Sequence, residues 1–210
     1  MGLKKPKFSI TLYSAFMIIT HQGGNYFKIQ SGDLAILVDP ENQRSYRGTQ
    51  IIVNTIKPAL AEKPEEGAEA QPVWIDNQGE YEVKGIRVQG WSTGFNPKTK
   101  REHTAYRVLF DEISIVILGA LTDVVNPEII SELSDADIVI APAGGAPYIA
   151  QQAIAKLIRQ MEPGIVIPSL YKDVKPFLKE LDQTDVKPEE KLVIKKKDIV
   201  EKAMKVCVLQ

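Results

Sequence analysis

The sequence predicts an α/β fold in which two β-sheets pack against each other with helices on the outside. Short apolar runs separated by turn residues fill most of the first half of the 210-residue chain, which indicates strands. After Gly119, strand-like runs alternate with helical patterns over short connections, as in consecutive βαβ units. No long linker separates the strand-rich part from the part with alternating strands and helices, so residues 17–210 are predicted to form a single domain.

Composition and charge restrict the class of protein. Hydrophobic residues make up 44% of the chain and charged residues 25%, as in soluble globular proteins with an ordinary core. The formal net charge of -1 provides no global field that would attract nucleic acid or an anionic membrane. A single cysteine, Cys207, excludes an intrachain disulfide and fits a reducing compartment. We therefore expect a cytoplasmic protein without a membrane segment, for which nucleic acid is a disfavoured partner.

Residues 1–16 are predicted to be an N-terminal extension that contributes one edge strand. Phe8, Ile10 and Leu12 alternate with polar residues, which is typical of a half-buried strand. Lysines precede this stretch, so a targeting segment is the alternative, but no small-residue cleavage site follows the apolar run.

The strands of the first half are predicted from apolar runs that end at turn residues. A turn at residues 31–33 joins the second and third of them into a hairpin. Residues 57–72, rich in proline and glutamate, are predicted to be a loop, and residues 97–102 a charged, exposed turn. The predicted strands cover residues 17–19, 25–30, 34–38, 51–53 and 73–75, two short stretches on either side of Gly85, and a second hairpin of 105–110 with 113–118.

The second half contains the helices. Residues 127–133 are predicted to be a short helix with Asn126 as N-cap and Pro127 in the first turn. Residues 149–161 place their apolar side chains on one face, and the following Pro163 and Gly164 end that helix. The remaining predicted elements are a helix at 174–181 and strands at 138–141, 165–167, 192–194 and 204–209.

Five passages, in chain order, resemble a known family. They are residues 17–30; Leu-Ala-Ile-Leu-Val-Asp-Pro at 34–40; Gln-Gly-Glu-Tyr-Glu-Val-Lys-Gly-Ile-Arg-Val at 78–88; Asp-Ile-Val-Ile-Ala-Pro-Ala-Gly-Gly at 137–145; and Pro-Gly-Ile-Val-Ile-Pro at 163–168. Together they resemble the metallo-β-lactamase fold, in the branch of ascorbate-6-phosphate lactonase-like and related zinc-dependent hydrolases, over about residues 17–209. The resemblance implies an αββα sandwich of two mixed sheets, with two divalent metal ions at the ends of inner strands.

The metal ligands of that family are missing from this sequence. The resemblance places the motif Thr-His-x-His-x-Asp-His on residues 54–60, directly after the strand at 51–53, and it places later ligands after the strands ending near residues 118 and 168. The ligand positions are then occupied by Thr55, Lys57, Ala59, Leu60, Ala120 and Leu170. None of these is a usual zinc ligand, and a protonated lysine would repel a cation. The sequence therefore predicts no cofactor, with one divalent ion (Zn or Mn) as the alternative.

These substitutions predict a non-catalytic family member, a pseudoenzyme that acts as a binding or assembly module. The resemblance implies that the chain assembles with further copies of itself or with an active paralogue. The alternative is a metal-dependent hydrolase of a small phosphorylated or lactone-like substrate with a displaced or reduced site. Its candidate residues are Asp39, Asp76, His103 and Asp123.

Simpler roles compete for two of these candidates. Asp39 follows a buried strand, so its carboxylate is expected to cap the backbone of a loop. His103 lies beside charged residues and is expected in a solvated turn. The sequence leaves open whether the strand ends near Thr55, Ala120 and Leu170 enclose a polar pocket or one filled by apolar side chains.

Overall fold

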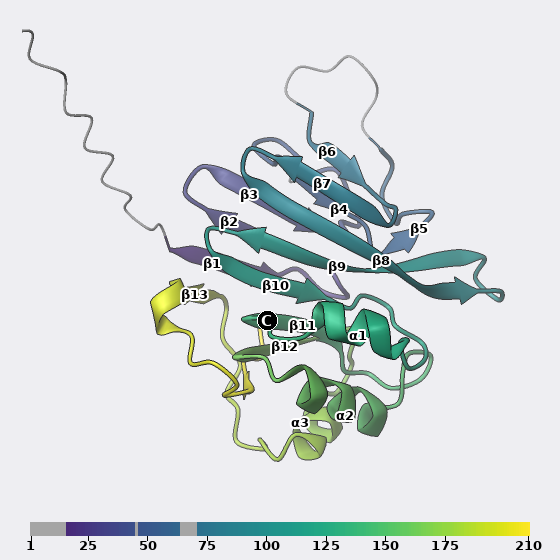
Figure 1. The fold of residues 1–210 in the computed structure, drawn as a ribbon, viewed down its shortest axis with the longest axis vertical. Helices are drawn as coiled ribbons and strands as arrows, with labels where there is room; N and C mark the ends of the chain where they lie inside the picture. Colours follow the sequence, from purple (N-terminus) through teal and green to yellow (C-terminus); the bar gives the residue numbers. More distant parts are fainter. Residues whose placement is uncertain (1–15, 45, 64–70) are drawn as a thin grey trace, which may run out of the picture.

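Two β-sheets pack face to face, and three α-helices lie against one of them (Figure 1). This arrangement is seen in a computed structural model that describes residues 16–44, 46–63 and 71–210. The predicted edge strand of the N-terminal extension therefore falls outside the described residues. No helix within the described ranges is long and apolar enough to cross a membrane.

The first sheet has six strands in the order β13-β1-β2-β3-β4-β6. The strands are β1 (Met17–His21), β2 (Phe27–Ser31), β3 (Leu34–Val38), β4 (Ile51–Val53), β6 (Val73–Ile75) and β13 (Leu192–Ile194). Neighbours from β13 to β3 run antiparallel, whereas β3, β4 and β6 run parallel. The sheet is therefore mixed, as the family resemblance implied.

The second sheet has eight strands, seven of them in the order β14-β12-β11-β10-β9-β8-β7, with β5 paired beside β9. They are β5 (Ile56–Lys57), β7 (Gly79–Val83), β8 (Ile86–Asn96), β9 (Arg101–Phe110), β10 (Ile113–Ile117), β11 (Ile138–Pro142), β12 (Ile165–Ser169) and β14 (Lys205–Val206). The pairs from β10 to β14 are parallel and those from β7 to β10 antiparallel.

The helices cover the parallel part of the second sheet. They are α1 (Pro127–Leu133), α2 (Gln151–Met161) and α3 (Lys175–Glu180), with a 3-10 turn at Lys196–Asp198. Asn126 caps α1 as predicted, because its side chain accepts a hydrogen bond from the Glu128 backbone N–H. The apolar face of α2 packs against the outward-facing side chains of β11 and β12. On the outer face of the first sheet lies a separate aromatic cluster that contains Tyr26, Tyr46 and Trp74.

The main core lies between the two sheets. Inward-facing residues of both sheets, including Ile36, Val53, Ile115 and Ile140, are fully buried there. Strands β11 and β12 are buried on both faces, since the second face meets the helices. This double burial explains why these two strands read as continuous apolar runs rather than as alternating patterns.

The hairpin of β8 and β9 is longer than the sequence predicts, and Figure 1 shows it projecting past the neighbouring strands. The predicted exposed turn at 97–102 is wrong at its second end, because β9 begins at Arg101. The reason is tertiary: β5 pairs with this polar stretch, with Ile56 opposite His103 and Lys57 opposite Glu102. Such pairing supplies backbone hydrogen-bond partners that local propensity does not reveal.

Candidate functional site

The ends of several strands meet at one edge of the sandwich around a cavity of about 340 Å³, which we call the strand-end cavity. Asp39 follows β3, Ala120 follows β10 and Leu170 follows β12, and all three line the cavity. The β8–β9 hairpin contributes Arg101 and His103. Crevices at the ends of strands are where open α/β sheets bind ligands, so this cavity is the candidate site.

Asp39 is the centre of a buried hydrogen-bond network beside the cavity. Its Oδ1 accepts a hydrogen bond from the Thr55 backbone N–H at 2.6 Å, and its Oδ2 accepts from Asn25 Nδ2 at 2.6 Å and from the Thr55 hydroxyl. The carboxylate thus fastens the loop after β4 to the residue that precedes Tyr26 and β2. The prediction that Asp39 caps the backbone of a loop is confirmed.

Burial raises the pKa of Asp39 to about 6, although the hydrogen bonds from Thr55 and Asn25 act in the opposite direction. Its backbone φ of 41° lies in the left-handed region, as does the φ of 54° at Leu170. Non-glycine residues adopt this region at a cost, and such residues gather at functional sites. The backbone at two cavity-lining strand ends therefore keeps a strained form.

The raised pKa of Asp39 makes the fold less stable as the pH rises. A carboxyl that binds its proton more tightly in the folded state stabilises the fold below about pH 4, and this contribution is lost as the pH rises through about 6. Between about pH 4.5 and 7.5, Asp39 alone should lower the free energy of unfolding by roughly 2 kcal/mol.

Urea unfolding of the wild type and the Asp39→Asn variant at both pH values measures this contribution, because other titrating groups are shared and cancel in the difference. Equal pH dependence in the two proteins would show that Asp39 titrates at its ordinary pKa.

His103 is buried, which corrects the expectation that it lies in a solvated turn. Its Nδ1 lies 2.7 Å from the Ala120 carbonyl oxygen, so Nδ1 carries the proton and Nε2 has the lone pair. Burial lowers the pKa of His103, and the nearby charge of Arg101 lowers it further. The ring is therefore a neutral hydrogen-bond acceptor at the wall of the cavity.

The positions where the resemblance placed metal ligands divide into three groups. Leu60, Ala120 and Leu170 line the cavity. Thr55 lies beneath it, buried and bonded to Asp39. Lys57 points elsewhere, because its Nζ donates a hydrogen bond to Asn77 Oδ1 at 2.7 Å, and Ala59 is not part of the lining. The cavity is thus neither purely polar nor filled by apolar side chains.

Of the four candidates for a residual polar site, the cavity brings together two, Asp39 and His103. Asp76 accepts a hydrogen bond from its neighbour Asn77, and Asp123 accepts one from the Val124 backbone N–H. Neither of them lines the cavity.

Sequence reasoning missed seven polar residues of the lining: Asn25, Glu41, Asn96, Thr99, Arg101, Thr122 and Tyr148. Asn25 and Tyr148 carry no motif that marks them. Arg101 reaches the site because β9 begins earlier than predicted. A signal for Glu41 exists, since it follows directly on the Asp-Pro pair that ends β3.

The lining does not fit the two-metal centre that the resemblance implies. Among the described residues, no group of three or more His, Cys, Asp or Glu side chains lies close enough together to hold a metal ion. Asp39 already accepts hydrogen bonds on both carboxylate oxygens. Asp39 and His103 both line the cavity, but among the described residues no third side chain completes a metal site with them. No reaction step through a metal ion follows from this arrangement of residues.

A model of the beta-lactamase superfamily domain matches residues 18–169. One similar solved structure is a candidate Zn-dependent hydrolase of the metallo-beta-lactamase superfamily from Thermotoga maritima, with 20% identity, a TM-score of 0.71 and coverage of 92% of this chain and 98% of that one. Igni18, a metallo hydrolase from Ignicoccus hospitalis, is 14% identical, with a TM-score of 0.64 and coverage of 93% and 95%.

A third similar structure, the metallo-beta-lactamase fold protein YhfI from Bacillus subtilis, is 10% identical, with a TM-score of 0.64 and coverage of 93% of this chain and 97% of that one. No curated protein sequence matches the chain significantly. At these identities the structural likeness establishes the fold, and the fold is the predicted sandwich of two mixed sheets.

The comparisons correct the prediction about cofactors. The sequence predicted none, because the ligand positions are substituted. The similar structures are named as Zn-dependent, metal-dependent or metallo hydrolases, so a divalent metal ion is the cofactor that this fold family implies. Substitution of ligand residues alone was therefore insufficient ground for the prediction.

Proposed function

Because the chain belongs to the beta-lactamase superfamily, we propose that it is a member that binds a small molecule in the strand-end cavity and has lost the hydrolytic reaction of its active relatives. The observation that supports this most is which residues occupy the positions of the family's metal ligands. Leu60, Ala120 and Leu170 present hydrocarbon to the cavity, and Thr55 is committed to the network around Asp39. Two-metal hydrolysis needs charged or imidazole ligands at those places to hold the ions and activate water.

The size and lining of the cavity support a binding role. A volume of about 340 Å³ lies within the range of small-molecule sites. Its lining combines apolar side chains such as Leu60 and Leu170 with polar ones such as Asn25 and His103, and small-molecule sites combine both kinds. The backbone at two lining residues, Asp39 and Leu170, is strained, and strained residues gather at functional sites. An assembly role, with a second copy or an active paralogue, stays a prediction of the sequence.

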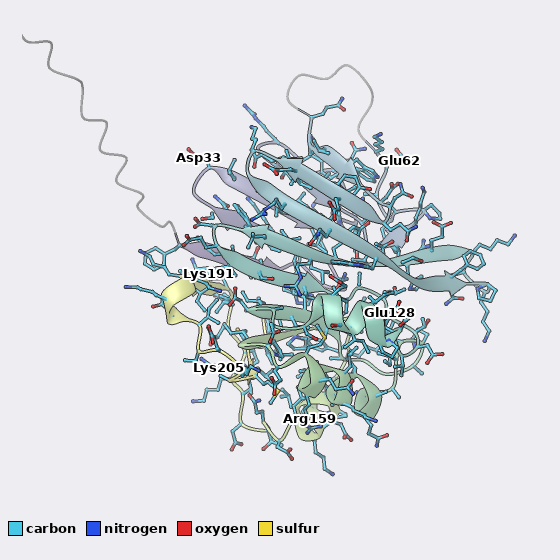
Figure 2. All side chains as sticks on the ribbon, in the orientation of Figure 1. Asp33, Glu62, Glu128, Arg159, Lys191 and Lys205 are labelled. Carbon is cyan, nitrogen blue, oxygen red and sulfur yellow. The ribbon has the colours of Figure 1, made fainter. Side chains whose placement is uncertain are left out.

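The surface charges favour a small ligand over a nucleic acid. Figure 2 shows the labelled acidic and basic side chains spread over different elements, such as Glu128 on α1, Arg159 on α2 and Lys205 on β14. Nucleic-acid binding requires a contiguous basic surface to contact phosphates.

The catalytic half of the proposal is tested with the full-length chain and added Zn²⁺ or Mn²⁺. Substrates are a phosphodiester, a phosphomonoester, a β-lactam and a lactone, each with a chromogenic readout. We expect rates no higher than those of the His103→Gln variant. A metal-dependent rate that His103→Gln abolishes and the control His21→Gln retains would instead establish the alternative, a hydrolase of a small phosphorylated or lactone-like substrate with a reduced metal site.

The binding half is tested by NMR with the ¹⁵N-labelled full-length chain and a panel of small polar fragments. Amide signals of Ala120 and Leu170 should shift for some of the fragments, while those of Asp33, in the turn between β2 and β3, should not. A panel without any shift at the cavity would contradict the binding role.

A further inference from the structure

Two side chains of opposite charge face the strand-end cavity without satisfying each other. Arg101, at the start of β9, and Glu41, two residues after Asp39, both line it. Within the described part of the chain, neither of them forms an ion pair with another side chain. A guanidinium presents a planar fork that matches a carboxylate, and charge-assisted hydrogen bonds are the strongest of the polar contacts. Besides the carboxylate of Asp39, which already accepts hydrogen bonds on both oxygens, the cavity therefore offers one cationic and one anionic contact.

Two further residues of the lining carry hydrogen-bond acceptors that have no donor among the described residues. Asn25 is 5% exposed, its Nδ2 donates to Asp39, and its Oδ1 has no partner in the described structure. His103 presents its Nε2 lone pair, since Nδ1 donates to Ala120. A buried acceptor without a donor costs about 1–3 kcal/mol. Together with Glu41, these acceptors suit a group that brings several N–H donors, as an ammonium does.

Apolar side chains form another part of the lining. Ile56, Leu60 and Leu170 form part of it, and two of these stand where the resemblance placed metal ligands. Burial of apolar surface favours an aliphatic group of matching size, at roughly 25 cal/mol per Å². The ligand should therefore carry an aliphatic portion next to its charged groups.

We propose that the strand-end cavity binds a small zwitterion with an aliphatic side chain, of the class of a free apolar amino acid. Its carboxylate pairs with Arg101, its ammonium donates to Glu41 and to the acceptors of Asn25 and His103, and its side chain contacts Leu60 and Leu170. This inference rests on the binding role proposed above. A ligand with only a negative charge would be repelled by Glu41, and a ligand with only a positive charge would be repelled by Arg101. Both therefore fit the cavity less well than a zwitterion does.

The test measures binding of L-leucine, L-methionine and L-valine to the full-length chain by calorimetry, with the ¹⁵N amide spectrum locating the site. Matched probes are N-acetyl-L-leucine, which lacks the positive charge, and L-leucinamide, which lacks the negative charge. At least one amino acid should bind, and both blocked forms of leucine should bind about tenfold more weakly or worse if leucine is the one bound.

Variants assign the two charges. Arg101→Gln and Glu41→Gln should each weaken binding of the amino acid about tenfold or more, while Lys98→Gln, at an exposed position of the same hairpin outside the lining, should change it less than twofold. Equal affinity for the amino acid and its blocked forms, or binding unaffected by Arg101→Gln and Glu41→Gln, would overturn the zwitterion proposal. If none of the amino acids binds while other fragments shift the cavity signals, the zwitterion proposal fails and the binding role stands.

Discussion

Replacement of Gly144 by alanine is expected to lower the free energy of unfolding by about 3 kcal/mol. A Cβ on Gly144 would lie 2.2 Å from the carbonyl oxygen of Leu170 and 3.3 Å from the carbon of that carbonyl. Both are backbone atoms, so no side-chain rotation can relieve the overlap. The strand end would have to move, and the hydrogen bond from the Leu170 N–H to the Gly24 carbonyl would move with it.

Urea unfolding of Gly144→Ala measures this loss, and the neighbouring Gly145→Ala is its matched control. Gly145 has a φ of +66°, and a Cβ there would meet only the Gln151 side chain, at 3.7 Å. That variant should lose about 1 kcal/mol from backbone conformation without a collision. Because Leu170 lines the strand-end cavity, Gly144→Ala should also weaken ligand binding. A loss no larger than that of Gly145→Ala would show that the two loops separate without strain.

Replacement of Asp39 by alanine is expected to lower the free energy of unfolding by about 3 kcal/mol at neutral pH. The change leaves the Thr55 N–H and hydroxyl buried without an acceptor, and Asn25 Nδ2 keeps only the Thr55 hydroxyl oxygen at 3.5 Å. Each donor without an acceptor costs about 1–3 kcal/mol. Removal of the desolvated carboxylate offsets part of this loss. Asp39→Asn should be milder, because its amide can accept from the Thr55 N–H and can donate to Asn25 once the Asn25 amide turns its partnerless oxygen inward.

Denaturant midpoints of both variants at neutral pH measure these effects. Asp33→Ala, at an exposed position in the turn between β2 and β3, is the control and should change stability by less than about 0.5 kcal/mol. If Asp39→Ala were as stable as Asp39→Asn, the network would contribute little beyond filling space.

Elements defined by local patterns were predicted closely. The sequence placed strands at 34–38, 51–53 and 73–75 and a helix at 127–133, and β3, β4, β6 and α1 have those bounds. Unbroken apolar runs and a proline after an asparagine are strong local signals, so tertiary context had little to change.

Elements that depend on distant partners were predicted less well. Strand β8 extends to Asn96 and β9 begins at Arg101 because the two strands pair with each other along this stretch and β5 pairs with β9. The strand predicted at 204–209 is reduced to Lys205–Val206, where it pairs with β12. Part of the candidate site followed from the sequence, which named Asp39, Leu60, His103, Ala120 and Leu170 of the lining. Arg101 and Glu41 acquire a role only when the cavity brings them together.

The place of β1 in the first sheet has a consequence for the order of folding. β1 lies between β2, which follows it closely in the chain, and β13, whose residues 192–194 are made only after all the strands from β2 to β12. His21 at the end of β1 also contacts the Leu209 carbonyl oxygen through Nδ1, at 3.2 Å. A ribosome must therefore synthesise the chain up to residue 194 before β1 acquires both neighbours. Contacts this distant in sequence slow folding, so β1 stays a sheet edge until β13 has been made, and during that time its free edge is exposed to chaperones.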